Sequence, residues 1–207
     1  MVQAIAIIQN EHRGLAAVLS CLSSVVRDIE DRSLEPDFEL FHAMVDYIES
    51  FLDRFHHPKE DDFLFSRLRQ RHPDAAALLD ELEDEHRCGE VLTAELKAAL
   101  EAYEKEGEGA FAPFREAVET YHAFERSHMG KEERDVIPLA RRYLAAEDWH
   151  EIDEAFTAND DPLFGDSPTA KYQKLFSAIA SRAPAPYGLG RRQAKEPGAR
   201  RGLLGRA

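Results

Sequence analysis

Apolar residues recur every three or four positions through four long segments of the chain, the spacing that puts them on one face of an α-helix. The segments run over residues 5–29, 41–63, 75–100 and 111–139, so that Phe63 and Leu139 end two of the predicted inner faces. Loops that contain proline, glycine and charged residues separate the segments. Because short loops make successive helices antiparallel, the sequence predicts an all-α fold, an up-down-up-down four-helix bundle.

Beyond the fourth segment we expect short additional C-terminal helices over residues 148–158 and 168–182, packed against one end or one side of the bundle. Residues 182–207 include seven basic side chains and one acidic side chain among glycines and prolines, which is typical of a flexible basic tail. A docking arm for an acidic partner is the alternative. The predicted divisions are a bundle with its capping helix over 1–165, an accessory helix over 166–182 and the tail over 183–207.

Composition and charge narrow the class of protein. Of 207 residues, 43% are apolar, which is enough for a buried core, and 40 acidic against 26 basic side chains give a formal net charge of −14. Because this charge repels phosphate, nucleic acid is not expected as the main partner. The longest uncharged run, 14–26, is too short to span a bilayer, and two cysteines fit a reducing compartment. We therefore expect a cytoplasmic protein with no membrane partner; the sequence names no protein partner.

Polar residues interrupt the apolar face of each predicted helix. Counting outward from the loops, at about 1.5 Å per helical residue, places one histidine of each helix at nearly the same height. On the second and fourth helices a glutamate follows that histidine by four positions, so both side chains lie on one face. Two carboxylates buried in one layer without a partner would each cost several kcal/mol, and a bound cation removes that cost. The candidate metal ligands are His12, His56, Glu60, His86, His128 and Glu132.

The same residues belong to an internal repeat. The string NEHRG at residue 10 corresponds to DEHRC at residue 84, and HHPKED at residue 56 corresponds to HMGKEE at residue 128. The first two helices therefore resemble the second two. A bundle with this pseudo-twofold symmetry would bring two sets of ligands face to face.

Four imidazoles and two carboxylates suit a pair of ions. If both glutamates bridge, each ion receives two histidine nitrogens and two carboxylate oxygens, and a shared solvent-derived oxygen makes five donors. Such a nitrogen and oxygen set without thiolate favours two iron ions. The set also suits manganese, which we favour less than iron, and it suits structural zinc least, since structural zinc prefers four ligands in a closed site.

Some positions near the candidate ligands are open to more than one interpretation. His57 is an alternative to His56, because it precedes Glu60 by three positions, although it points about 100° further round the helix. Pro58 and Gly130 each weaken the helix two positions after a candidate histidine, which indicates either a local bulge or a tolerated irregularity. Three further residues could orient the ligands or could be solvated or capping groups: His122, Glu125 and Glu133.

These motifs, in this order on four successive helices, resemble the hemerythrin-like family of HHE cation-binding domains over about residues 1 to 165. The resemblance implies a non-haem di-iron centre, bridged by oxo or hydroxo and by carboxylates, with the six candidate residues as ligands. Oxygen carriers of the family place two histidines one turn apart on the third helix, whereas here Leu82 and Glu90 flank His86. This difference argues against reversible oxygen carriage.

Three functions are compatible with these residues, the first two of which the resemblance implies. The first is binding or sensing of a small ligand, namely dioxygen, nitric oxide or peroxide. The second is a di-iron enzyme that detoxifies peroxide or nitric oxide or repairs iron centres. The third is ferritin-like iron handling, which the Glu-x-x-His pairs Glu83 with His86 and Glu125 with His128 would suggest. The sequence alone does not choose between a sensor and an enzyme.

Overall fold

The structure is a computed structural model that describes residues 3–31, 34–158, 177 and 179–190. This described part is built from helices and contains one isolated backbone bridge, between Pro184 and Gly190. The helices are α1 Gln3–Glu30, α2 Phe38–Ile48, α3 His57–Lys59, α4 Ser66–Arg71, α5 Ala76–Glu106, α6 Phe111–Lys131, α7 Ile137–Tyr143 and α8 Ala146–Thr157. Between them lie the π-helical turns η1 Glu49–His56, η2 Glu60–Phe65 and η5 Glu132–Val136, and the 3-10 turns η3 Pro73–Ala75 and η4 Gly107–Ala110.

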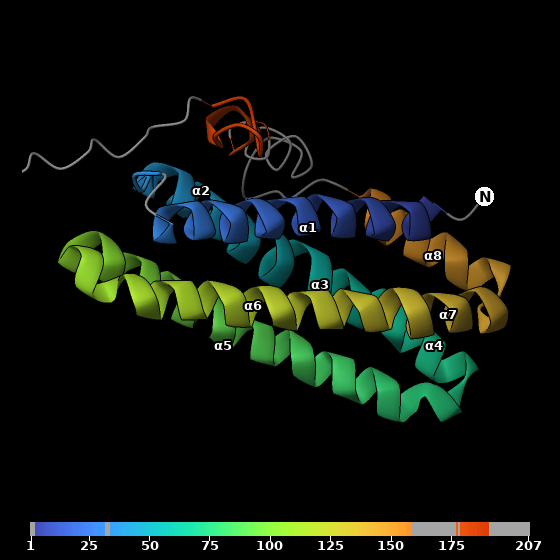
Figure 1. The fold of residues 1–207 in the computed structure, drawn as a ribbon. Coiled ribbons are helices and arrows are strands. Elements are labelled where there is room, and N and C mark those ends of the chain that lie inside the picture. The colour runs from blue at the N-terminus through green and yellow to red at the C-terminus, as the bar shows by residue number, and fades with distance from the viewer. Residues whose placement is uncertain (1–2, 32–33, 159–176, 178, 191–207) are drawn as a thin grey trace, which may run out of the picture.

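These elements form four long rods that run side by side (Figure 1). The first and third rods are α1 and α5, the second runs from α2 through α4, and the fourth is α6 continued by α7. Asp37 caps α2 by accepting a hydrogen bond from the Leu40 N–H at 3.0 Å, and Gly107 ends α5 at a φ of 73° that glycine adopts without strain. The predicted all-α, up-down-up-down bundle is confirmed.

The π-helical turns change which residues face inward. Phe63 is 38% exposed, and Leu64, the next residue in η2, is buried instead. After η5 the same change leaves Leu139 half-buried, and Ala140, the next residue, is fully buried instead. A π-helical turn pairs residue i with i+5 and so advances the inner face by one position relative to an α-helix. The prediction for Phe63 is therefore wrong, and Leu139 lies only at the edge of the core.

Two apolar clusters fill the bundle and leave a polar layer between them. On α1 the smaller cluster ends at Ile8 and the larger one begins at Leu15. On α5 the corresponding change falls between Leu82 and Leu96. Each interval contains the candidate histidine of its helix, so the candidate ligands lie between two apolar layers that exclude water.

The helix predicted near residues 148–158 is confirmed as α8. It packs along the start of α1, where the Ala4 N–H donates to Asp153 at 2.7 Å. Arg71 at the end of α4 donates two hydrogen bonds to Asp148, at 2.7 and 3.0 Å. Helix α8 therefore covers the end of the bundle that holds the smaller cluster.

The second predicted helix, over 168–182, lies mostly outside the described residues. Its last turn is described: Ile179 is buried against the larger cluster, and Arg182 pairs with Asp37 and Glu39 at the start of α2. Most of the predicted tail also lies outside the described residues, and the three-part division of the chain stays a prediction. None of the described helices is both long and apolar enough to cross a membrane.

Candidate metal centre

The four candidate histidines meet as two pairs in the middle of the bundle. Nε2 of His12 lies 3.2 Å from Nε2 of His56, and Nε2 of His86 lies 3.1 Å from Nε2 of His128. All four side chains are buried, at most 5% exposed. The histidines therefore share one layer, as counting from the loops predicts.

Glu60 and Glu132 lie between the two histidine pairs. Each has carboxylate oxygens within 4.0 Å of nitrogens from both pairs. Both side chains are buried, and none of their four oxygens makes a hydrogen bond. This is the placement that two bridging carboxylates require. The separations to Nε2 include Glu60 to His56 at 3.3 Å and to His86 at 3.8 Å, and Glu132 to His12 at 3.2 Å and to His128 at 3.3 Å.

Each of the four histidines also contacts a carboxylate through its other ring nitrogen. An ionised carboxylate only accepts, so a histidine beside one donates the proton of its Nδ1, and in a neutral ring Nε2 then presents its lone pair to the centre. Outer carboxylates of this kind fix the orientation of metal-binding imidazoles and make them more basic. The contacts from Nδ1 are His12 to Glu133 at 3.2 Å, His56 to Glu11 at 2.8 Å, His86 to Asp61 at 2.8 Å and His128 to Glu85 at 3.0 Å.

Sequence reasoning considered only one of these outer carboxylates, Glu133. The other three were missed, although the internal repeat contains the signal. Glu11 and Glu85 each come directly before a candidate histidine, and Asp61 and Glu133 each come directly after a candidate glutamate. The pseudo-twofold symmetry therefore extends from the candidate ligands to the groups that orient them.

The charges of the metal-free layer are divided unequally between the two glutamates. Burial raises the pKa of Glu60 well above its ordinary value. Burial acts on Glu132 in the same direction, but His128 and the other histidines outweigh it and hold its pKa well below the ordinary range. For His128, burial lowers the pKa, yet Glu132 and its neighbours raise it to about 9. Without a metal, protons on the histidines balance the charge of Glu132, and a bound cation would displace them.

Glu125 is a further buried carboxyl group beside the centre. Burial raises its pKa to about 7, although His128 and the Tyr121 hydroxyl partly oppose that shift. Gly89 on α5 leaves room for it, because a Cβ at that position would lie 3.4 Å from Glu125 Oε1. This carboxyl group can therefore be protonated or ionised near neutral pH.

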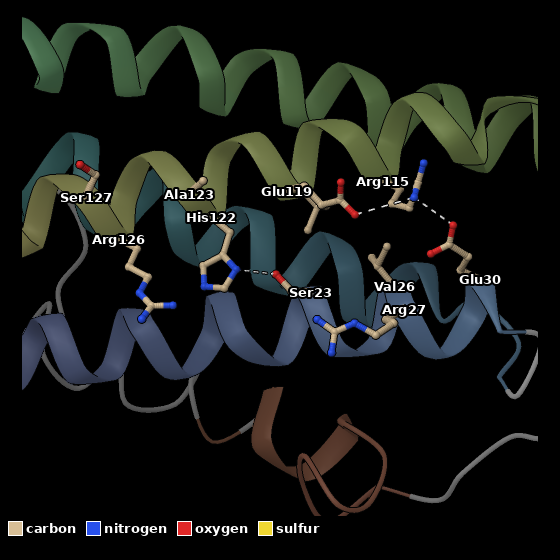
Figure 2. Close-up of a pocket in the computed structure, with 11 residues that line it drawn as sticks. Ser23, Val26, Arg27, Glu30, Arg115, Glu119, His122, Ala123, Arg126 and Ser127 are labelled. Atoms are coloured by element: carbon tan, nitrogen blue, oxygen red, sulfur yellow. Dashed lines mark hydrogen bonds and ion pairs between the residues drawn. The ribbon is translucent and has the colours of Figure 1, made fainter.

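His122 lies away from the centre. Its Nδ1 is 2.9 Å from the Ser23 hydroxyl in an open cleft of about 560 Å³ between α1 and α6 (Figure 2). The cleft also contains Arg115, which pairs with Glu30 at 2.9 Å and with Glu119 at 3.9 Å. None of the six candidate ligands lines it. The role of orienting a ligand, considered for His122 from the sequence, is therefore not supported.

His56 and His57 are not alternatives, because both side chains are buried and they face different histidine pairs. His56 pairs with His12, whereas one ring nitrogen of His57 lies within 4.8 Å of nitrogens of His86 and His128. Rings on consecutive residues of a regular helix point about 100° apart. Here His56 ends the π-helical turn η1 and His57 begins α3, and both rings reach the layer.

Comparison with known protein families agrees with this geometry. The model of the Hemerythrin HHE cation binding domain matches residues 3–140, which include all four rods, apart from the last residues of α7, and all six candidate ligands. No curated protein and no solved structure gives a significant match. Since the matched region is well over half of the chain, the protein belongs to the hemerythrin family of HHE cation-binding domains.

Proposed function

We propose that the chain holds two iron ions in its polar layer and uses them to bind or sense a small ligand, either a diatomic gas or peroxide. The observation that supports this most strongly is the direction of the four imidazoles. Each Nδ1 contacts an outer carboxylate, so that four Nε2 atoms converge on two buried carboxylates without hydrogen bonds. A layer of six such groups is costly in a bundle unless cations complete it.

The donor set fits iron. Imidazole and carboxylate ligands without thiolate suit iron, and the two glutamates are within reach of both histidine pairs. The ligands would be His12, His56, Glu60, His86, His128 and Glu132. Bound iron would supply one-electron redox chemistry and an open position for a small ligand.

The rest of the chain controls the surroundings of that position. The two apolar clusters keep water out, and the outer carboxylates hold the imidazole rings in place. Glu125 can hold or give up a proton at its carboxyl group near neutral pH, close to His128. A small uncharged molecule fits such an enclosed centre better than a large substrate.

The alternative functions differ in what supports them. A di-iron enzyme would use the same residues, with Glu125 as a proton donor, and only turnover separates it from a sensor. Ferritin-like iron handling would need the pair of Glu83 and His86, but Glu83 pairs with Arg69 at 2.6 Å instead of joining the layer. This contact disfavours the ferritin-like function.

Metal analysis of the full chain, reconstituted anaerobically with ferrous iron, tests the metal site. We expect two irons per chain in the wild type, and fewer in His12→Ala and in His128→Ala. His122→Ala is the matched control, since it removes a histidine from α6 outside the layer, and it should keep two irons. One zinc per chain, unaffected by either ligand substitution, would contradict the proposal.

Exposure of the reduced protein to dioxygen, peroxide and nitric oxide in parallel tests the function. A saturable change in the optical spectrum without repeated consumption supports binding or sensing. Continued consumption of peroxide or nitric oxide would support the enzyme instead. No spectral change with any of the three would exclude both.

A further inference from the structure

The open cleft between α1 and α6 gathers positive charge that the metal centre does not use. Three arginines line it, Arg27, Arg115 and Arg126, against two glutamates, Glu30 and Glu119. The whole chain has the opposite balance, with 26 basic and 40 acidic side chains. A hollow surface of about 560 Å³ with an excess of cations attracts a small anion, even on a protein of negative net charge.

The two ends of the cleft differ in how their charges are paired. At one end Arg115 pairs with Glu30 and Glu119. At the other end the side chains of Arg27 and Arg126 are exposed, and neither makes a hydrogen bond or an ion pair within the part of the chain that the structure describes. Figure 2 shows their guanidinium groups on either side of the His122 ring. The excess positive charge therefore lies around His122.

His122 adds a hydrogen-bond donor between the two arginines. Its Nδ1 contacts the Ser23 hydroxyl, and its other ring nitrogen faces away from Ser23, towards Arg126 (Figure 2). Burial and the charge of Arg126 lower the pKa of His122, which favours a neutral ring with one N–H. Since a hydroxyl can donate, Ser23 can donate to Nδ1 while Nε2 carries the ring proton. The Nε2 N–H is then free to donate to an anion.

We propose that this cleft binds a small sugar phosphate, with its phosphate group held by Arg27, Arg126 and His122. A phosphate presents oxygens in several directions, which suits donors that come from two helices, whereas a single arginine already matches a planar carboxylate. Both arginine side chains are exposed, so their guanidinium groups have room to close on the ligand. The negative net charge disfavours a long polyanion such as nucleic acid, but a single phosphate meets mainly the local charge of the cleft.

The paired end of the cleft suits the sugar. Arg115 and Arg126 are eleven residues apart, about 16 Å along α6, so the cleft is longer than one phosphate group. The carboxylates of Glu30 and Glu119 can accept hydrogen bonds from sugar hydroxyls at that end. Among the described residues that line the cleft, His122 has the only aromatic ring, so a nucleobase would find little to stack on. These features favour a sugar phosphate over a nucleotide.

Isothermal titration calorimetry of the full chain with ribose 5-phosphate tests the proposal. We expect one molecule bound per chain, and binding at least about tenfold weaker in Arg27→Gln and in Arg126→Gln, because each loses a hydrogen bond between charged groups. Arg141→Gln is the matched control. Arg141 on α7 is also exposed and without a partner in the described part of the chain, but it lies outside the cleft, so this variant should bind as the wild type does.

Related compounds test the class of ligand. Ribose should not bind, and inorganic phosphate should bind at least about tenfold more weakly than ribose 5-phosphate, since it lacks the hydroxyls that reach the paired end. Inorganic phosphate that binds as tightly as ribose 5-phosphate, or adenosine monophosphate that binds more tightly, would show that the assigned class is wrong. No binding of ribose 5-phosphate, or equal losses in all three arginine variants, would overturn the site itself.

This inference does not depend on the metal centre, because none of the six candidate metal ligands lines the cleft. His122→Ala should keep two irons yet bind ribose 5-phosphate at least about tenfold more weakly than the wild type. Unchanged binding of ribose 5-phosphate by this variant would overturn the role given to His122 and with it the proposal, whatever its iron content. A wild type with fewer than two irons would contradict the proposed function alone.

Discussion

The two halves of the repeat present the same groups to the centre from different surroundings. In the first half, Lys59 lies 3.5 Å from the ring centre of Phe55 and 4.9 Å from that of Phe156 on α8, and 11% of its side chain is exposed. Its counterpart Lys131 is 23% exposed and pairs with Glu85. Among the helices that the structure describes, none lies beside the second half as α8 lies beside the first. The repeat therefore sets the geometry of the centre, and α8 sets how much protein surrounds one side of it.

The outer carboxylates show the consequence of this difference. Burial raises the pKa of Glu11 to about 7, whereas for Glu85 hydrogen bonds from Lys131 and His128 outweigh burial and lower the pKa. Similar fractions of the two side chains reach solvent, 16% and 21%. The pKa values therefore shift in opposite directions for two reasons. Glu11 is surrounded by more protein, and Glu85 accepts hydrogen bonds from Lys131 and His128. Two carboxylates with the same contact to a histidine are held in different electrostatic environments.

A substitution that loosens α8 should have the largest effect on the difference between the two halves of the repeat. Ile152 is fully buried in α8, and Ile152→Ala should lower the free energy of unfolding by about 2–5 kcal/mol, through lost burial and the cavity left behind. Water would then reach Lys59 and Glu11. We expect unfolding in urea to show the loss, and transfer of iron to an excess of chelator to become faster.

Leu100→Ala is the matched control for Ile152→Ala. Leu100 is fully buried in the larger cluster, so its truncation should cost a similar free energy of unfolding. At urea concentrations that give both variants the same stability, iron should leave Ile152→Ala faster. Equal release rates would show that α8 does not shield the centre.

The next largest effect is on the stability of the metal-free protein, and it should have opposite signs for matched substitutions in the two halves of the repeat. Without metal, native Glu11 keeps its proton up to about pH 7 and the unfolded chain loses it near pH 4.5, so this residue lowers stability as pH rises through that window. Glu11→Gln should therefore stabilise the metal-free protein at pH 8 by on the order of 2 kcal/mol. Glu85→Gln should destabilise the metal-free protein. The pKa of Glu85 is lower in the folded chain than in the unfolded chain, so the ionised side chain stabilises the fold above the unfolded pKa. This contribution is lost as pH falls through the folded pKa.

Urea unfolding of the metal-free variants at pH 5 and pH 8 measures both effects. Glu11→Gln should differ from the wild type more at pH 8 than at pH 5. If the two substitutions change stability in the same direction at pH 8, the environments of the two halves are alike, and the contrast drawn from α8 is wrong.

The sequence predicts the bundle and the two ligand motifs because both depend on regular helical spacing. It does not predict that Phe63 turns outward, since Pro58 indicates a bulge without saying where the register changes. The same irregularity hides His57, which regular geometry directs away from the layer. Glu11 and Asp61 were missed for another reason: each orients a histidine on a different helix, and only packing shows which ring a carboxylate reaches.

The smallest effects should come from the two more exposed outer carboxylates. Asp61 and Glu133 have side chains 35% and 44% exposed, so water can replace part of the contact that each makes with a histidine. Asp61→Asn and Glu133→Gln should each weaken iron binding by less than about tenfold, the lower end of the range for groups that orient ligands. Competition with a chelator of known affinity measures both. Because the two positions are related by the repeat and exposed to a similar degree, the losses should be nearly equal. If Asp61→Asn weakens iron binding tenfold more than Glu133→Gln does, the two halves differ at all four outer carboxylates and not only on the side that α8 covers.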